Sequence, residues 1–254
     1  MIELSSVSKV YSDGHAALHH VSLRVETGST VALLGPSGSG KTTLLKLINC
    51  LVAPTEGRVI VNGTDVTQVD PVELRRRIGY VIQEAGLFPH LTASANVEIV
   101  PRLLGWSRAR RRSRTRELFS LMALEWDHVA QAYPAQLSGG QRQRVGLARA
   151  LAADPAIVLM DEPFGALDPL TRRRLQDEFV ALKRRLQKTV VLVTHDVDEA
   201  FRLADQVAVL VEGRLIQVGT PATIRAAPAS PFVAAFLADQ RPEESGKRLE
   251  SENA

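Results

Sequence analysis

The apolar positions of this chain gather into short continuous runs, each about the length of one strand. Four such runs lie far apart in the sequence, at residues 31–34, 78–82, 156–160 and 189–194. A strand that helices cover on both faces has no solvent-facing positions, so these runs predict buried parallel strands. Segments with helical spacing separate them, and this alternation predicts an α/β fold.

Other parts of the chain show different patterns. From residue 91 to residue 151 the spacing is helical throughout, with longer helices predicted at 91–104 and 108–124. Strands joined by tight turns are predicted at residues 2–11 and 16–25, at 58–62 before an Asn-Gly pair, and in a closing hairpin at 206–211 and 214–218. Short helices follow near 221–226 and 231–238, and the polar, charged stretch 239–254 is expected to be a disordered tail.

Composition narrows the class of protein. Of 254 residues, 45% are apolar and 23% are charged, as in ordinary soluble globular proteins, and no apolar run approaches the length of a membrane span. The net charge of +3 is too small to indicate binding of nucleic acid.

Six arginines lie between residues 108 and 116, and a solvated helix face is the favoured interpretation. Anionic lipid headgroups or nucleic acid stay open as alternatives, the latter weakened by the lack of interleaved aromatic residues.

A glycine-rich loop carries the clearest chemical signal. It follows the apolar run at 31–34 and precedes a stretch with helical spacing, and it consists of Gly35, Pro36, Ser37, Gly38, Ser39, Gly40, Lys41, Thr42 and Thr43. A strand, a glycine loop and a helix in this order point backbone N–H groups at a polyphosphate. Lys41 is expected to supply a mobile positive charge to the β- and γ-phosphates, and Thr42 to ligate Mg²⁺. The loop therefore predicts ATP-type nucleotide binding with Mg²⁺.

A second helix start has the features of an anion site. Ser138 and Gln141 have the spacing of a capping box, and Gly139 and Gly140 between them leave backbone N–H groups accessible. Two phosphate-seeking helix starts, 97 residues apart from Lys41 to Ser138, are hard to explain by packing alone. Because the second start lies on the helical stretch, displaced from the glycine loop, it is expected to close on a nucleotide held by another copy of the chain.

Polar residues follow three of the predicted parallel strands. Asp161 and Glu162 end one of them, His195 ends another and Gln83 a third. The carboxyl ends of parallel strands are where such sheets bind ligands, so Asp161 is a candidate for Mg²⁺ and Glu162 for the base that activates water. His195 is either structural or a contact to the γ-phosphate, and Gln83 is either a solvated loop residue or part of the site.

Two further residues have open interpretations on the sequence alone. Asp168 stands just before a helix and is predicted to be its N-cap. Tyr11 ends the first strand, and on the sequence alone its ring is expected to pack on its neighbours, with stacking on a base as the alternative.

Taken together in this order, the glycine loop, Leu137-Ser138-Gly139-Gly140-Gln141, Asp161-Glu162 and His195 resemble the ATPase subunits of ABC transporters over residues 1–238. The resemblance implies a RecA-like P-loop NTPase α/β core with an antiparallel β-subdomain and an inserted helical subdomain at about residues 88–153. It also implies roles: Tyr11 stacks on adenine, Gln83 senses Mg²⁺ and the membrane partner, Asp168 makes a dimer contact, and His195 binds the γ-phosphate.

A narrower likeness concerns the cargo. Residues 81–92, 101–106 and 160–169 look like the corresponding segments of the quaternary-amine importers for glycine betaine, choline and carnitine. This likeness implies a quaternary amine as the cargo. The resemblance to ABC transporter ATPases implies an ATP-sandwiched homodimer, two integral membrane permease subunits and an indirect substrate-binding protein. It also implies a peripheral position on the cytoplasmic face of the cell membrane and no nucleic acid. An importer ATPase for another solute, such as an amino acid, and a soluble ABC ATPase not coupled to transport stay as alternatives.

Overall fold

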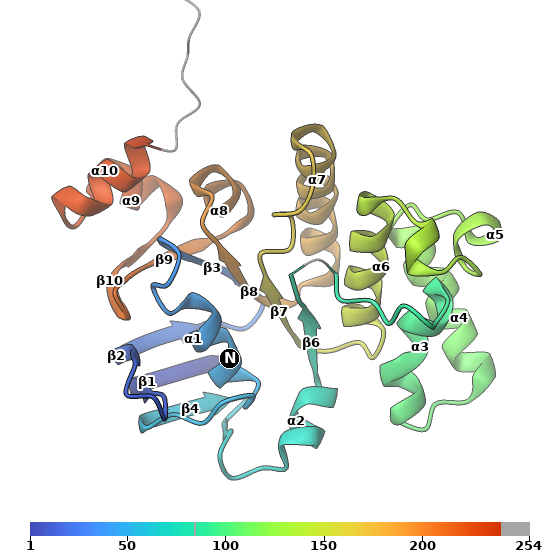
Figure 1. Cartoon of the computed structure of the whole chain (residues 1–254), viewed down its shortest axis with the longest axis horizontal. Coiled ribbons are helices and arrows are strands. Elements are labelled where there is room, and N and C mark those ends of the chain that lie inside the picture. Colours follow the sequence, from blue (N-terminus) through green and yellow to red (C-terminus); the bar gives the residue numbers. More distant parts are fainter. Residues whose placement is uncertain (84, 240–254) are drawn as a thin grey trace, which may run out of the picture.

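The computed structural model describes residues 1–83 and 85–239, and these residues form two sheets with flanking helices (Figure 1). The larger sheet has the strand order β10-β9-β3-β8-β7-β6, and the smaller has the order β2-β1-β4-β5. The strands of the larger sheet are β3 (Thr30–Leu34), β6 (Ile78–Val81), β7 (Ile157–Asp161), β8 (Thr189–Thr194), β9 (Gln206–Val211) and β10 (Arg214–Gly219). Those of the smaller sheet are β1 (Ile2–Val10), β2 (Ala16–Val25), β4 (Glu56–Val61) and β5 (Thr64–Asp65).

The four apolar runs are neighbours in the larger sheet, as their pattern predicts. β3, β8, β7 and β6 pair in parallel, and only β10 at one edge runs antiparallel to its neighbour β9. All residues of β3 and β8 are buried, which explains why neither sequence alternates between apolar and polar positions.

Alternate residues of each central strand pack into two different hydrophobic clusters, one on each face of the sheet. Ile157 and Leu159 of β7 face the cluster that includes α1 (Lys41–Ile48) and the antiparallel sheet. Val158 and Met160 face the opposite side. Each fully buried side chain of this size contributes about 1.5–3 kcal/mol to folding, so the sheet is held from both faces.

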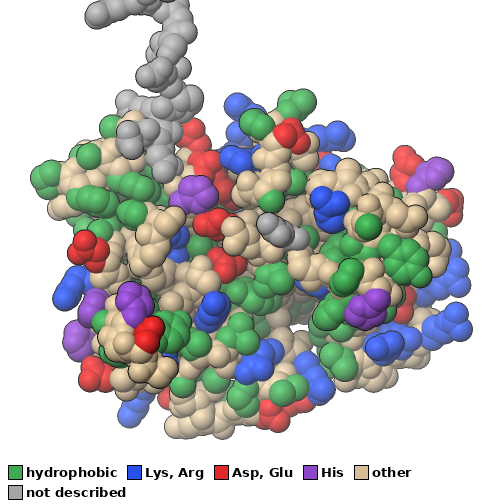
Figure 2. Space-filling model, in the orientation of Figure 1, with side chains coloured by type: hydrophobic (Ala, Val, Ile, Leu, Met, Phe, Trp, Pro, Cys, Tyr) green, Lys and Arg blue, Asp and Glu red, His purple; other side chains and the backbone are tan. Residues whose placement is uncertain are grey.

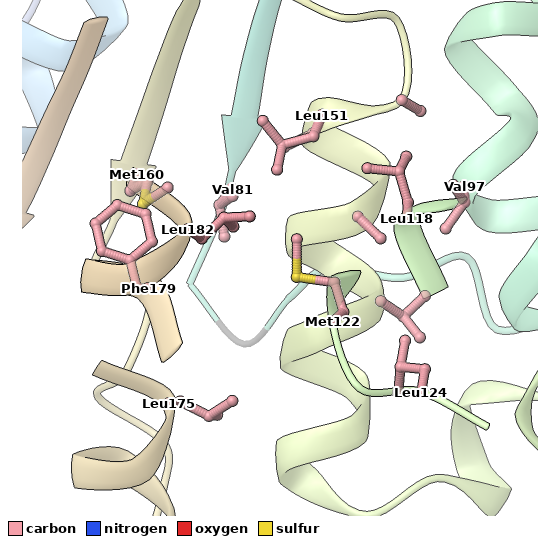
Figure 3. Packing of buried hydrophobic residues seen from close by; sticks show 14 of the residues in the cluster. Val81, Val97, Leu118, Met122, Leu124, Leu151, Met160, Leu175, Phe179 and Leu182 are labelled. Atoms are coloured by element: carbon pink, nitrogen blue, oxygen red, sulfur yellow. The ribbon is translucent and has the colours of Figure 1, made fainter. Parts of the chain in front are cut away.

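Among the helices of the stretch 91–151, α6 (Gly139–Leu151) packs against β6 of the larger sheet, and α3 (Ala93–Leu103) and α4 (Arg108–Leu121) pack on α6. The stretch also contains α5 (Trp126–Val129) and a 3₁₀ turn (Pro134–Gln136). Figure 3 shows part of the core that they share with the sheet: Leu118 of α4 lies near Val97 of α3, and Val81 of β6 lies near Leu182 and Phe179 of α7 (Pro169–Leu186). The prediction that residues 91–151 form helices and no strand is confirmed. The two longer helices are shorter than predicted, because α3 starts after its N-cap Thr92 and α4 ends at Leu121.

The remaining helices are short and lie outside the helical stretch. They are α2 (Pro71–Arg76), α8 (Val197–Leu203), α9 (Pro221–Ala226) and α10 (Pro231–Asp239). The last two lie close to the predicted positions. Helix α2 is not among the predicted elements, although Asp70 caps its first turn and Pro71 starts it. The predicted disordered tail lies outside the described residues, apart from residue 239 at the end of α10.

The arginine-rich helix α4 turns most of its guanidinium groups toward partners within the chain. Arg111 pairs with Glu98 at 3.1 Å, and Arg114 pairs with Glu117 at 2.8 Å. Arg110 lies over the ring of Trp106 at 3.6 Å, a cation–π geometry. Lys and Arg side chains gather over this part of the surface (Figure 2). Four of the six arginines stay exposed, as predicted for a solvated helix face, whereas the ion-paired Arg111 and Arg114 are half-buried.

Candidate nucleotide site

The glycine loop lies between β3 and α1, in the context that the sequence predicted. Gly40 is the N-cap of α1 with a φ of 96°, a left-handed conformation that suits glycine. A Cβ at Gly35 would lie 2.0 Å from the carbonyl oxygen of Leu210, so no side chain fits there. The loop is thus held against the sheet by close backbone approach, which only glycine at this position allows.

Lys41 lies folded into this loop. Its Nζ donates hydrogen bonds to the carbonyl oxygens of Gly35 at 2.8 Å and Pro36 at 2.7 Å, and the residue is 6% exposed. Burial lowers the pKa of Lys41, while the carboxylates of Glu162 and Asp161 oppose that shift. The sequence predicted a mobile charge, whereas here the ammonium group is bound to the loop that it would serve. The Lys41 ammonium group therefore lies within the glycine loop, beside the backbone N–H groups that are expected to bind phosphate.

The ends of β6, β7 and β8 bring the predicted polar residues together. Register pairs Val81 with Met160, and Asp161 with Val193, so the residues that follow these strands share one edge of the sheet. Glu162 lies in the middle of the group. Its Oε2 accepts a hydrogen bond from Gln83 Nε2 at 3.3 Å, and its Oε1 lies 3.2 Å from His195 Nδ1.

The backbone of Glu162 has a left-handed φ of 45°, which is uncommon for a residue other than glycine. Its N–H donates to the carbonyl of Val193 at 3.0 Å, which holds the turn against β8. Such conformations persist where surrounding contacts fix them, and they concentrate at functional sites. The side chain keeps about a quarter of its surface exposed, so a ligand at this edge can reach it.

Asp161 connects this strand edge to the glycine loop. Its Oδ1 accepts a hydrogen bond from the Thr42 hydroxyl at 3.0 Å. Burial raises the pKa of Asp161, and nearby Glu162 adds to the shift, while the bond from Thr42 and the charges of two lysines oppose it. Burial destabilises the charged form of Asp161, and the neighbouring groups offset this only in part, so a bound cation would stabilise the carboxylate. With the Thr42 hydroxyl and the Gln83 amide it offers the oxygen donors that Mg²⁺ prefers.

In residues 1–83 and 85–239, no cluster of three or more histidine, cysteine, aspartate or glutamate side chains forms a metal site by itself. Mg²⁺ is usually held by one or two protein carboxylates together with substrate phosphates and water.

Tyr11 reaches the loop from the other sheet. Its hydroxyl lies 3.2 Å from the hydroxyl of Thr43, and the ammonium group of Lys9 lies 5.2 Å from the centre of its ring. The sequence alone favoured a tyrosine packed on its neighbours, and these contacts agree with that. They also place the ring beside the glycine loop, which strand spacing did not reveal.

The second predicted anion site has the expected local structure. Ser138 caps α6: its Oγ accepts a bond from the Gln141 N–H at 3.2 Å, and its own N–H donates to Gln141 Oε1 at 2.8 Å. Among the residues that the structure describes, no hydrogen bond or ion pair joins this helix start to the glycine loop. Asp168 is the N-cap of α7, as predicted, and accepts a bond from the Thr171 N–H at 3.0 Å.

One residue that connects α6 with the segment after Gln83 is not among the predicted site residues. Arg149 of α6 donates hydrogen bonds to the carbonyl oxygens of Ala85 at 2.8 Å and Gly86 at 2.7 Å, just beyond Gln83. Burial lowers the pKa of its guanidinium group. The signal that could have found it is an arginine among the small and apolar residues 145–151.

Comparison with known proteins gives consistent matches. The sequence profile of the family described as "ABC transporter" matches residues 18–165. The chain is 50% identical to the glycine betaine/carnitine/choline transport ATP-binding protein OpuCA of Bacillus subtilis (strain 168), over 95% of this chain and 63% of that protein. It is 49% identical to the glycine betaine uptake system ATP-binding protein YehX of Escherichia coli (strain K12), over 93% of this chain and 76% of that protein.

A solved structure matches as well. The dimeric structure of a post-hydrolysis state of the ATP-binding cassette MJ0796 bound to ADP and Pi has a TM-score of 0.78 and 39% identity, and covers 87% of this chain and 99% of that one. The chain spans just under two thirds of the length of the B. subtilis relative. No helix within the described ranges 1–83 and 85–239 is both long and apolar enough to cross a membrane.

Proposed function

We propose that this chain, which belongs to the ABC transporter family of ATP-binding proteins, hydrolyses ATP and couples hydrolysis to the import of a quaternary amine. The observation that carries the enzymatic part is the position of Glu162 between Gln83 and His195, at the sheet edge that also holds the glycine loop. A carboxylate held in this way beside a phosphate cradle has the geometry of a general base for an attacking water.

The loop from Gly35 to Thr43 would bind the triphosphate through its backbone N–H groups and the N-terminus of α1. Lys41 would exchange its two carbonyl partners for phosphate oxygens, and a charge-assisted bond to phosphate favours that exchange. Thr42, Asp161 and Gln83 would hold Mg²⁺, which supplies charge neutralisation of the phosphates when bound. The ring of Tyr11 would stack on the adenine.

In the hydrolytic step, Glu162 would accept the proton of a water that attacks the γ-phosphorus. His195 would donate a hydrogen bond to a γ-phosphate oxygen from the other side of Glu162. Its contact with Glu162 at 3.2 Å holds the imidazole at the edge of the sheet where that oxygen would lie. Proton acceptance and charge stabilisation would thus come from adjacent strands, β7 and β8.

The second anion site would complete the nucleotide site of another copy. Ser138, Gly139, Gly140 and Gln141 would contact the γ-phosphate held by the partner's loop, with Asp168 at the contact between copies. The dimeric cassette bound to ADP and Pi supports this arrangement, since its fold matches over 87% of this chain. ATP would then join two copies, and hydrolysis would release them.

Residues 1–238 would form one ATP-binding domain, with a helical subdomain at about residues 88–153. The segment 83–90 and the helical subdomain would dock on two membrane permease subunits at the cytoplasmic face of the membrane, with a substrate-binding protein acting upstream. Phe88 supports this surface because it is a large apolar residue that is 45% exposed. Arg149 would couple the docking segment to α6, which carries Ser138.

The cargo is proposed from the names of the relatives. The proteins from B. subtilis and E. coli are transport ATP-binding proteins for glycine betaine and, in the first case, carnitine and choline. Deletion of the gene should therefore abolish uptake of labelled glycine betaine or choline. Unchanged uptake of these together with loss of an amino acid would assign the protein to the alternative cargo. Purification from native membranes without any integral membrane partner would instead favour a soluble ABC ATPase.

The enzymatic proposal is tested with Glu162→Gln, which keeps size and shape but removes the base. This variant should bind ATP, lose hydrolysis by about 10²–10⁴-fold, and accumulate as an ATP-bound dimer in size-exclusion chromatography with Mg²⁺. Adding Ser138→Arg should block the partner site and return the protein to monomer. Hydrolysis at the wild-type rate, or a variant that stays monomeric even with its reconstituted permease, would reject the shared-site mechanism.

A further inference from the structure

Two segments that flank the candidate base are joined by one arginine. Residues 163–168 follow Glu162 and lead into α7, and residues 194–196 carry His195 from the end of β8 to α8. Arg172, in the first turns of α7, contacts both of them. About a third of its side-chain surface is exposed, so it lies at the rim of the site rather than in the core.

The first contact fixes the segment after Glu162. Arg172 Nη2 donates to the carbonyl oxygens of Gly165 at 3.3 Å and Leu167 at 3.1 Å. The N–H of the same Gly165 donates to the carbonyl oxygen of Glu162 at 3.2 Å. Gly165 therefore connects the guanidinium group to the backbone of Glu162.

The second contact fixes the segment that carries the histidine. Arg172 Nη1 lies 3.8 Å from Asp196 Oδ2. The N–H of Asp196 donates to the Thr194 hydroxyl at 3.0 Å, and its Oδ1 accepts from the Glu199 N–H at 2.9 Å. Asp196 is thus held from both sides, and its position sets that of the neighbouring His195.

These contacts close a ring of five residues. It runs from Arg172 through Gly165 to Glu162, across the 3.2 Å contact to His195, and back through Asp196 to Arg172. We propose that Arg172 is a positioning residue for hydrolysis, which keeps the carboxylate of Glu162 and the imidazole of His195 at a fixed separation. The inference rests on the proposed function for its role in hydrolysis, whereas the coupling between the two segments does not depend on it.

A purely local role predicts something different. The bonds to Gly165 and Leu167 also stabilise the turn before α7, and an arginine that did only this would leave residues 194–196 unaffected. A positioning role requires that the loss of Arg172 loosens both segments. It also requires a loss of kcat without a matching loss of ATP affinity, because Arg172 is not part of the phosphate cradle.

The test uses Arg172→Met in the full chain, with Arg173→Met as a matched control. Arg173 is exposed on the same turn of α7 and has no part in the ring. Hydrogen exchange in nucleotide-free protein should become at least about twofold faster in both segments, 163–168 and 194–196, for Arg172→Met alone. Faster exchange in residues 163–168 only, or equal exchange in both variants, would overturn the inference.

Kinetics give the second readout. Arg172→Met should lower kcat about tenfold, since small misplacements of catalytic groups are costly, while the Kd for ATP changes less than about twofold. Arg172→Lys should restore part of kcat. Asp196→Asn keeps the cap of α8, and adding it to Arg172→Met should cost little more than either change alone. If the losses of kcat in the double variant were additive, the ring of contacts would be contradicted. If the wild type did not hydrolyse ATP, the proposed function would be rejected, and the exchange test would still decide whether Arg172 couples the two segments.

Discussion

The hydroxyl of Thr42 donates a hydrogen bond to Asp161 Oδ1 at 3.0 Å and so joins the start of α1 to the end of β7. The two residues are 119 positions apart in the chain. One comes from the phosphate loop and the other from the strand edge that carries Glu162. Because burial raises the pKa of Asp161, its carboxylate lacks full compensation in this arrangement and gains from a nearby cation.

Replacing Asp161 should therefore alter the response to Mg²⁺. Asp161→Asn removes the charge but keeps the shape, and we expect the Mg²⁺ concentration for half-maximal ATPase activity to rise by about 10-fold or more. Asp127→Asn, an exposed carboxylate in α5, is the matched control and should leave the Mg²⁺ titration unchanged. Equal titration curves for Asp161→Asn and wild type would contradict the assignment of Asp161 to the metal.

Lys41→Ala should weaken nucleotide binding itself. Charge-assisted hydrogen bonds contribute about 1.5–3 kcal/mol, so the Kd for ATP should rise about 10- to 100-fold in isothermal titration calorimetry. The bonds from Lys41 Nζ to the carbonyls of Gly35 and Pro36 are lost as well, and the melting temperature should fall. Lys188→Ala, which removes a lysine paired with Asp154, should keep ATP affinity. An unchanged Kd for Lys41→Ala would remove this residue from the site.

Gly35→Ala should distort the glycine loop. The added Cβ would lie 2.0 Å from the Leu210 carbonyl oxygen, a backbone atom that cannot move aside without shifting β9. We expect a loss of about 2–4 kcal/mol in unfolding free energy, the range of severe overpacking, and loss of ATP binding. Gly14→Ala is the control, since nothing lies within 4 Å of its added Cβ, and its positive φ should cost only about 1 kcal/mol. Urea unfolding that gave equal losses for both would contradict the close approach.

Glu199 should make stability depend on pH. Burial raises the pKa of Glu199 to about 7, Asp196 and Glu162 add to the shift, and the Thr194 hydroxyl and Arg172 oppose it. Because the folded state favours the protonated acid, this contribution to stability is complete below about pH 4.5 and is lost as the pH rises through 7.

The variant Glu199→Gln tests this dependence. It stays neutral at every pH and can still accept the bond from Thr194, so at pH 8 it should be more stable than wild type by up to about 3 kcal/mol. At pH 5 the advantage should be small. Denaturant unfolding at pH 5, 6.5 and 8 measures it, with Glu125→Gln, an exposed glutamate, as the control. A stability difference that did not grow with pH would show that the carboxyl of Glu199 is not protonated in the folded protein.

The sequence by itself determined most of the helices and strands and the chemistry of the glycine loop. Strands such as 189–194 are buried on both faces, so their apolar continuity is visible without knowledge of their neighbours. The glycine loop is visible in the sequence because it is local. Gly40, Lys41 and Thr42 are adjacent in the chain, and their spacing alone fixes how a helix can begin at a phosphate. The capping box at Ser138 and Gln141 is likewise set within four residues.

Only the tertiary structure decided which side chains meet. Gln83, Glu162 and His195 each follow a different strand. Strand order, which depends on packing across the whole sheet, brings Gln83 to 3.3 Å and His195 to 3.2 Å from the carboxylate of Glu162. The contacts of Arg172 likewise depend on how α7 lies beside the turn after β8. Such contacts join residues far apart in sequence, and no short-range spacing encodes them, so the ring around Glu162 became visible only in the folded chain.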